Sequence, residues 1–308
     1  MAVVIWILLA YVALNALAWL LSLAAFRIWT RKVRWTADGL MPDAVPFEKG
    51  SGADAVLFIH GFNDVPAVWR RFAGPFVAKG FHVEALRLEG LGERRPRFFG
   101  GFPLARWQQA VTDRVNALAE THDRVFLVGH SMGGALALDA AYRHDFWREE
   151  ARYAYAPLAG VALLAPLVDV SRARSPLLPA RTWFRLSRVL LPGLRYLPSV
   201  FSETQGTEDD PSFTYRRDRF MSVAVLGAMF ALVRRLRAID KSRVVTPVRV
   251  YVAGNDRVVD SEATHRWFAA CPATRAVVDV PDAPHVLPLV AGWRRMAAGI
   301  AARFAVGE

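Results

Sequence analysis

The sequence predicts an α/β fold, with a mostly parallel sheet flanked by helices, that is preceded by one membrane-spanning helix. Three observations support this prediction. Short apolar runs, typical of strands buried on both faces, alternate with helical patterns along the 308 residues. A serine flanked by glycines stands where one apolar run gives way to a helix-forming stretch. Near the N-terminus, residues 2–26 are apolar and uncharged.

The segment 2–26 is predicted to be a transmembrane anchor. As a helix it would be about 37 Å long, enough to cross a hydrocarbon core of about 30 Å with some tilt. A cleaved signal peptide is the alternative, and it is disfavoured by the length of the apolar run, by the lack of a basic region before it and by the lack of a small-residue cleavage site. Asn15, in mid-span, is expected to be a tolerated polar residue against a neighbouring helix or, secondly, a dimerisation contact.

Charge indicates the orientation of this anchor. By the positive-inside rule, the bulk of the protein lies in the cytoplasm as a single-pass membrane protein, because basic residues flank the span on its C-terminal side only, at Arg27, Arg31, Lys32 and Arg34. The net charge of +11 suits an anionic membrane. No dense Lys/Arg block with interleaved aromatics occurs, so no nucleic-acid partner is expected. The sequence does not define an oligomeric state.

The chain is divided into residues 1–35, the anchor with its basic flank, and one α/β domain over residues 36–308. Single domains of this size are common among α/β architectures. Cys271 is the only cysteine, so neither an intramolecular disulfide nor a cysteine-based metal site is expected.

The elements before the serine follow in order. A Pro- and Gly-punctuated connector, 36–54, leads to a strand at 55–59. A helix is predicted over 66–80, with aromatic residues at helical spacing and Gly80 as its C-terminal stop. A strand at 81–88 and an amphipathic helix at 104–121 precede the next apolar run.

That run, which begins at Arg124, ends at Ser131 and is followed by a helix-forming stretch at 135–142. A strand that runs straight into a helix strains the backbone at the corner, and only small neighbours leave room for it, which accounts for Gly129 and Gly133. The serine hydroxyl would then be exposed beside a helix N-terminus. A chance Gly-x-Ser-x-Gly in a turn is the alternative, and the strand before and the helix after disfavour it.

This motif in this context resembles the nucleophile elbow of the α/β-hydrolase superfamily. Gly129-His-Ser-Met-Gly-Gly134 is most similar to its lipase, carboxylesterase and serine-aminopeptidase-like branch, and the resemblance covers the chain from about Val56 to the C-terminus. It implies a Ser, acid, His triad in that chain order. Relatives carry a Gly-His-Gly-like turn where this chain has Leu91 between two glycines. That departure leaves the triad untouched but weakens any transfer of subfamily specificity.

The resemblance also assigns an oxyanion loop. His60-Gly61-Phe62 follows the strand at 55–59, as the His-Gly loop does in the superfamily. Gly61 would permit the turn, and the backbone amides of Phe62 and Met132 would be the two oxyanion donors. His60 is expected to form hydrogen bonds within the loop and not to act as a base.

After a strand at 160–165 the alternation of strands and helices is interrupted. Arginines and apolar residues mix over 171–197, and a second helical stretch is predicted over 213–238. An insertion at this place, about 171–238, is the cap over the nucleophile in the superfamily. A solvated basic helix pair without a substrate role is the alternative.

The acid and the base of the triad come from the last two strands. A strand at 247–253 runs into the turn where relatives keep the acid, which indicates Asp256. Asp260 competes with it but is explained as a helix N-cap, and Asp169, after the strand at 160–165, is the reserve candidate. The last strand, 275–280, leads to His285 and a closing helix. Of the seven histidines, only His285 lies in a loop after the final strand, where the superfamily has its base.

These residues together predict a serine hydrolase that cleaves carboxylic esters, of hydrophobic or lipid-derived substrates such as monoacylglycerol or lysophospholipid. Ser131 would attack, His285 would carry the proton and Asp256 would orient the imidazole. No metal or organic cofactor is implied, since neither a zinc-ligand cluster nor a dinucleotide loop is recognised. A serine aminopeptidase-like peptidase, an acyltransferase with the same triad, and a non-enzymatic membrane scaffold remain alternatives.

Overall fold

The computed structural model describes residues 1–94, 102–147, 156–175, 177–199, 203–204 and 212–307. The helices are α1 (Ala2–Arg31), α2 (Gly74–Ala78), α3 (Leu104–Ala119), α4 (Met132–Trp147), α5 (Ala180–Leu190), α6 (Val223–Arg237), α7 (Ser261–Ala269) and α8 (Trp293–Val306). The strands are β1 (Phe47–Lys49), β2 (Asp54–Ile59), β3 (His82–Leu86), β4 (Arg124–His130), β5 (Gly160–Leu164), β6 (Tyr196–Pro198), β7 (Glu203–Thr204), β8 (Tyr215–Arg216), β9 (Phe220–Ser222), β10 (Val248–Ala253) and β11 (Thr274–Val280).

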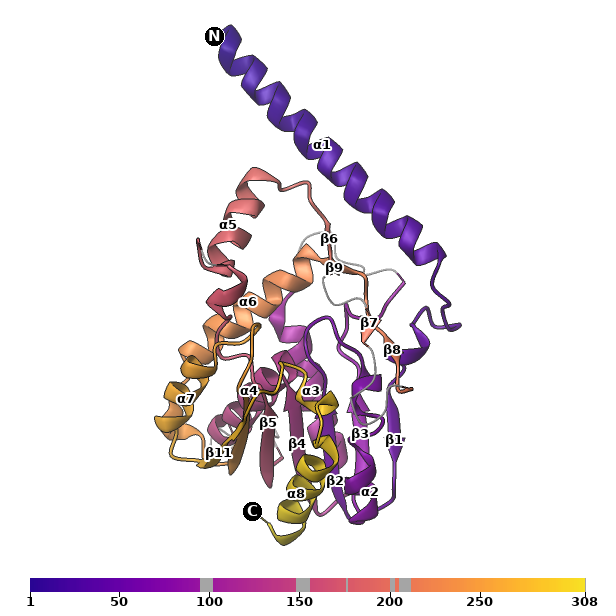
Figure 1. Cartoon of the computed structure of the whole chain (residues 1–308), viewed down its shortest axis with the longest axis vertical. Coiled ribbons are helices and arrows are strands. Elements are labelled where there is room, and N and C mark those ends of the chain that lie inside the picture. Colours follow the sequence, from indigo (N-terminus) through magenta and orange to yellow (C-terminus); the bar gives the residue numbers. More distant parts are fainter. Residues whose placement is uncertain (95–101, 148–155, 176, 200–202, 205–211, 308) are drawn as a thin grey trace.

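Seven strands form the central sheet in the order β1-β3-β2-β4-β5-β10-β11. Every neighbouring pair is parallel except β1 with β3. This confirms the predicted mostly parallel sheet. The carboxyl ends of the parallel strands therefore share one edge, the upper edge of the sheet in Figure 1.

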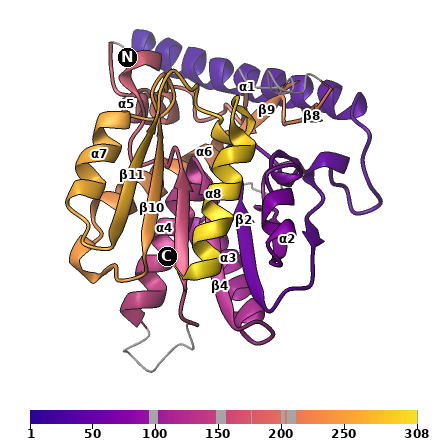
Figure 2. The same ribbon diagram turned by 60° about the horizontal axis from the view of Figure 1, so that its bottom comes forward.

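Helices cover both faces of this sheet, because alternate side chains of a strand point to opposite faces. Val56 and Phe58 of β2 belong to a core that includes side chains of α2 and α8. Leu57 and Ile59 belong to the opposite core, with α3, α4 and α6. Figure 2 shows α8 in front of the sheet and α3 and α4 behind it. Burial on both faces explains why these strands are apolar without alternation.

The helix predicted over 66–80 is interrupted. A 3-10 helix occupies Pro66–Trp69, and the α-helix is limited to α2. Pro75 lies in the first turn of α2, where its missing N–H costs nothing, but it cannot continue a helix that began earlier, since its ring clashes with the carbonyl four residues back. Gly80, with φ of 86°, follows α2, in agreement with the predicted stop.

The helix predicted over 213–238 begins only at Val223. Before it lie the short strands β8 and β9, and β9 pairs with β6 in an antiparallel ladder. Backbone groups engaged in that ladder hold the chain extended. The pairing joins segments about 25 residues apart, so a local periodicity cannot detect it.

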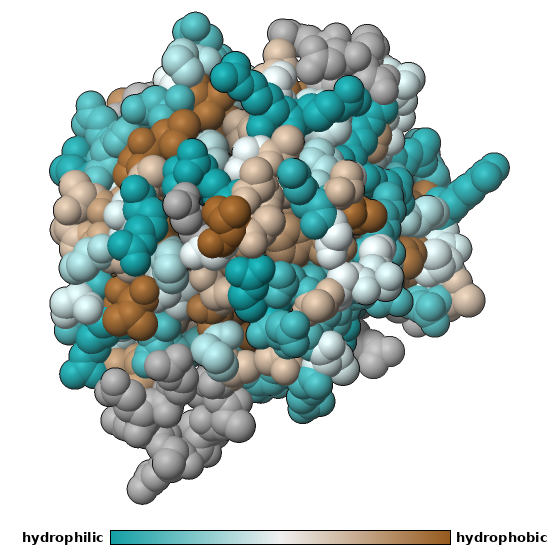
Figure 3. All heavy atoms as spheres, turned by 90° about the horizontal axis from the view of Figure 1, so that it is seen from below, coloured by the Kyte–Doolittle hydropathy of each residue, from teal (hydrophilic) through white to brown (hydrophobic). Residues whose placement is uncertain are grey.

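We use "cap" for residues 171–238, the predicted insertion; its residues 176, 200–202 and 205–211 lie outside the described part of the chain. Its helices and the β6-β9 ladder lie above the carboxyl edge of the sheet (Figure 1). Helix α1 passes beside them and is long and apolar enough to cross a membrane. The opposite face of the molecule is mostly hydrophilic, with small scattered apolar groups (Figure 3).

Candidate active site

Ser131 stands between the last residue of β4 and the first residue of α4, with φ of 55°. This left-handed conformation is strained for a residue other than glycine and is held by the close packing around it. A Cβ on Gly129 would overlap the backbone of Gly133, and a Cβ on Gly133 would overlap the carbonyl of Ile59. Both glycines are therefore required by close approach of strand, turn and helix.

His285 and Asp256 reach this serine from the two loops that follow β11 and β10. The Ser131 hydroxyl lies 2.8 Å from Nε2 of His285, and Nδ1 of His285 lies 2.7 Å from Oδ2 of Asp256. A carboxylate can only accept, so Nδ1 carries the proton and Nε2 is free to accept from the hydroxyl. The structure brings together the three residues that the sequence indicates.

The side chain of Asp256 is only 1% exposed. Burial acts to raise the pKa of Asp256, but the His285 hydrogen bond and the amides of Val258 and Val259 outweigh it and hold this pKa below its ordinary value. The carboxylate thus stays ionised at neutral pH, as required to stabilise a protonated imidazole.

The two competing aspartates have other partners. Asp169 forms an ion pair with Arg237 and accepts a hydrogen bond from the Val170 amide, 2.9 Å away. Asp260 caps α7 by accepting from the Ala263 amide at 2.8 Å, as the sequence predicts. His285 is hydrogen-bonded to neither.

The amides expected to stabilise an oxyanion lie beside the serine. Met132 is the first residue of α4, so its N–H has no intrahelical acceptor. Among the described residues, no hydrogen bond engages the amide of Met132 or of Phe62. Gly61 brings the loop close to the elbow, since a Cβ there would lie 3.2 Å from Cβ of Ser131.

His60 is fully buried and joins two loops. Its Nε2 accepts from the Leu88 amide at 3.1 Å, so its Nδ1 carries the proton and donates to the Gly61 carbonyl at 3.0 Å. Burial lowers the pKa of His60 to about 4. It is neutral at physiological pH. One of its hydrogen bonds lies within the loop, as expected, and the other joins the loop to Leu88 after β3.

Sequence reasoning missed His130, the residue before the serine. Its Nε2 donates to the backbone carbonyl of His285 at 3.0 Å, and the two rings lie 4.9 Å apart. Burial lowers the pKa of His130 to about 3, so it is neutral. Its position beside Ser131 in the motif was the available signal. His130 ties the loop of His285 to the elbow.

Above these residues lies a pocket of about 520 Å³. Most of the cap residues that line it are apolar, among them Trp183 and Phe184 from α5, Leu197 from β6, Met221 from β9 and Met229 from α6. Its lining also includes polar side chains, among them Asn63 and Asp64 after the oxyanion loop and Arg217 of the cap. The cavity is shaped for a substrate with a large apolar part.

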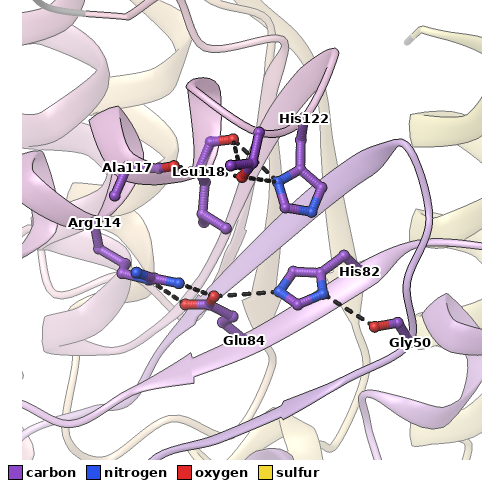
Figure 4. A network of polar contacts seen from close by, with 8 residues as sticks. Gly50, His82, Glu84, Arg114, Ala117, Leu118 and His122 are labelled. Atoms are coloured by element: carbon purple, nitrogen blue, oxygen red, sulfur yellow. Dashed lines mark hydrogen bonds and ion pairs between the residues drawn. The ribbon is translucent and has the colours of Figure 1, made fainter.

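A second polar cluster lies away from this pocket, at the edge of the sheet (Figure 4). One ligand atom each from Glu48, His82 and Glu84 would fit around a metal ion. However, the Glu84 carboxylate is bound by both donor groups of Arg114 and by His82 at 3.2 Å. The carboxylate that a metal would need is already paired with a cation, so the cluster is explained as an ion-pair network between β3 and α3.

Replacing Glu84 with Gln is expected to lower the free energy of unfolding by about 1 kcal/mol at pH 7. Burial raises the pKa of Glu84, while Arg114 and His82 lower it further, so the net shift is downward. A carboxylate with a depressed pKa stabilises the fold above its unfolded pKa, and the contribution is lost as the pH falls through the folded value. Urea unfolding at pH 7 and below pH 4 measures this. An equal difference at both pH values contradicts the assignment.

The fold and the geometry of the elbow define a lipase/esterase-type α/β-hydrolase. A family model described as "serine aminopeptidase, S33" matches residues 51–287, and the chain belongs to this family.

Several proteins that the chain resembles are lipases. The chain is 25% identical over 256 residues to the thermostable monoacylglycerol lipase of Bacillus sp. (strain H-257), covering 81% of this chain and 90% of that protein. The crystal structure of Paleococcus ferrophilus monoacylglycerol lipase superimposes with a TM-score of 0.65 at 17% identity, covering 86% of this chain and 99% of that one. A soluble variant of Saccharomyces cerevisiae monoglyceride lipase gives 0.65 at 15% identity, covering 84% and 90%. These structural likenesses support the fold.

Proposed function

We propose that the protein is a membrane-anchored serine hydrolase that cleaves carboxylic esters of lipid-derived substrates, such as monoacylglycerol or lysophospholipid. The observation that carries this proposal is the unbroken chain of hydrogen bonds from Ser131 through His285 to Asp256, at 2.8 and 2.7 Å, beneath a largely apolar pocket. The likeness to monoacylglycerol lipases supports the substrate class.

In this proposal His285 takes the proton of Ser131 as the hydroxyl oxygen attacks the ester carbonyl. Asp256 stabilises the imidazolium that forms. The amides of Phe62 and Met132 donate to the tetrahedral oxyanion. His285 then returns the proton to the leaving alcohol, and water attacks the acyl-serine by the same route in reverse. In an acyltransferase an alcohol would take the place of that water. If an added alcohol captured most of the acyl group, the protein would be an acyltransferase.

Helix α1 supports the second part of the proposal, the anchor. It carries no charge before Arg27, and by the positive-inside rule the basic flank supports a cytoplasmic position for the catalytic domain. The protein should remain in the membrane fraction after extraction with high salt, because apolar burial does not depend on ionic strength. A mature N-terminus near Arg27, found by protein sequencing, would mean that the segment is a cleaved signal peptide and not an anchor.

A chain-length series of p-nitrophenyl esters tests the substrate class. We expect kcat/KM to rise at least about tenfold from acetate to dodecanoate, since two buried methylenes already contribute about 1.6 kcal/mol. Monoacylglycerol and lysophospholipid in anionic vesicles should be cleaved faster than in dilute monomeric solution. Replacing Arg181, Arg185 and Arg188 with Ser should weaken that response more than it weakens hydrolysis of a short ester. Equal rates for acetate and dodecanoate, with no response to vesicles, would leave a short-chain carboxylesterase.

A peptidase is the second candidate, because one observation favours it. Asp64 lines the pocket, is 2% exposed and has one carboxylate oxygen without a hydrogen-bond partner, which is what a free substrate amine would require. Arg217 lies 3.8 Å from the other oxygen and disfavours a cation there. Cleavage of aminoacyl anilides that is faster than that of esters, and that is lost in Asp64→Asn, would establish the peptidase.

A further inference from the structure

Three polar side chains interrupt the apolar segment 2–26 of α1, and each is hydrogen-bonded to the backbone of the cap. The Tyr11 hydroxyl donates to the Val189 carbonyl at 2.6 Å. The Asn15 amide group donates to the Leu190 carbonyl at 3.3 Å and accepts from the Gly193 amide at 2.9 Å. The Ser22 hydroxyl accepts from the Arg195 amide at 3.3 Å. Asn15 therefore contacts the cap turn, where the sequence indicated a neighbouring helix.

These side chains form one stripe. Positions 11, 15 and 22 are separated by four and seven residues, so they lie on one face of a helix. The same stripe continues to Phe26, whose ring stacks on Tyr196 of β6 at 4.0 Å between centroids, and to Trp29, whose ring lies 6.1 Å from Phe220 of β9. Helix α1 thus contacts the end of α5 and both strands of the β6-β9 ladder, which lie beneath it in Figure 2.

The stripe fits the backbone and not merely the side chains of the cap. A Cβ on Gly193 would overlap the backbone carbonyl of Asn15. The backbones of α1 and of the cap turn therefore touch at a position that has no side chain. Val189 and Leu190 are the last residues of α5, whose final carbonyls have no intrahelical donor. Tyr11 and Asn15 supply those donors.

The side chains at this junction are apolar and exposed. Val189 is 69% and Leu190 58% exposed, although the backbone carbonyls beneath them are hydrogen-bonded to α1. In water such carbonyls could be solvated, whereas the hydrocarbon layer offers them no hydrogen-bond donor. Apolar side chains turned outward around hydrogen-bonded carbonyls are the arrangement that a hydrocarbon environment requires.

Helix α5 continues the same surface. Its exposed Trp183, Leu186 and Leu190 follow the spacing i, i+3, i+7 on one face, and arginines occupy the opposite face at positions 181, 185 and 188. A helix of this kind can bury its apolar face in lipid while long arginine stems on the other face carry their charges toward a polar environment.

We propose that Tyr11, Asn15 and Ser22 are positioning residues that dock the segment 189–195 of the cap onto the anchor. Insertion of α1 then carries the apolar face of α5 into the acyl-chain layer, and the ester substrate enters the pocket from the leaflet. The pocket wall is built from the docked elements, with Trp183 and Phe184 from α5 and Leu197 from β6. The proposal rests on the proposed anchor and lipid substrate.

The test uses the full chain and the double variant Tyr11→Phe/Asn15→Leu. Both changes make α1 more apolar, so anchoring should persist while docking is lost. In vesicles of phosphatidylcholine and phosphatidylglycerol, kcat/KM for monododecanoylglycerol should fall about tenfold, mainly through KM, as three hydrogen bonds are removed. Hydrolysis of p-nitrophenyl butyrate in detergent micelles should stay unchanged. Leu17→Ala is the matched control, since position 17 lies on the opposite face of α1 from Asn15 and is exposed.

A nitroxide at position 189, in a background with Cys271→Ser, reports where the turn lies. In the otherwise native chain it should be more accessible to oxygen than to a water-soluble nickel chelate, and the double variant should reverse this. A nitroxide at the exposed Val245, which precedes β10 at the opposite edge of the sheet, is the water-exposed reference.

The outcomes are distinguishable. A native chain that high salt releases from vesicles overturns the anchor, and the docking proposal with it. An anchored chain whose label at 189 is exposed to water, or a double variant that behaves as the native chain does, overturns docking alone. The Ser131→Ala variant tests the hydrolase assignment separately from docking. Loss of butyrate hydrolysis in this variant, with its cap still docked, supports the assignment.

Discussion

Replacing Ser131 with Ala should reduce ester hydrolysis by at least about 10⁴-fold while leaving the fold intact. The attacking oxygen is lost, and the His285 side chain is hydrogen-bonded to no hydroxyl other than that of Ser131 among the described residues. His285→Ala removes the group that is hydrogen-bonded to the Ser131 hydroxyl and placed to accept its proton, and should cost about as much. Initial rates on p-nitrophenyl esters, together with labelling by a fluorophosphonate, measure this effect.

Asp256→Asn should reduce the rate by about 10³- to 10⁴-fold, because the amide favours the wrong imidazole tautomer. The double variant Ser131→Ala/His285→Ala should be no worse than either single variant, since the residues act as one unit. Asp169→Asn is the matched control and should retain activity within about twofold, because Asp169 is paired with Arg237. If Asp169→Asn inactivated the enzyme and Asp256→Asn did not, Asp169 and not Asp256 would be the acid of the triad.

Replacing Asp139 with Ala should lower the free energy of unfolding by about 3–5 kcal/mol. Asp139 is fully buried on α4 and accepts from Gln108 of α3 at 2.7 Å, from Arg143 at 2.9 Å and from Arg235 of α6 at 3.0 Å. Without the carboxylate, the buried Arg143 guanidinium loses its counter-charge. Urea unfolding followed by tryptophan fluorescence in detergent measures the change.

Asp113 on α3 provides the control for this prediction. It accepts a hydrogen bond from Gln109 at 2.6 Å, but the pair is exposed. Asp113→Ala should therefore change the unfolding free energy by less than about 0.5 kcal/mol. A loss below 1 kcal/mol for Asp139→Ala would mean that water reaches Arg143 in the variant and that the α3-α4-α6 junction does not depend on this carboxylate.

Local patterns in the sequence were sufficient for the fold class and for Ser131 as candidate nucleophile. Strands buried on both faces are recognisable as short apolar runs. The strained turn at Ser131 requires small neighbours, and these are visible in the sequence as Gly129 and Gly133. The helix predicted over 213–238 was wrong in its first part because β9 pairs with β6, a contact that no local window contains.

The choice between the two candidate acids depends on the order of strands. Asp169 and Asp256 each follow a strand, but β10 is the neighbour of β11 whereas β5 lies one strand further away. His285 follows β11, so a carboxylate after β10 is the one within hydrogen-bond reach. The sequence indicated Asp256 only through the family resemblance; sheet order supplies the physical reason.

The sequence by itself determined an apolar helix, a buried parallel sheet and an elbow serine, because each follows from the chemistry of residues near one another in the chain. Only the tertiary structure decided how distant polar groups are satisfied. It shows that His130 holds the carbonyl of His285, and that Asn15 pairs with the backbone of a turn about 175 residues away. A buried polar group must find a partner, and which partner it finds depends on the packing of the whole chain.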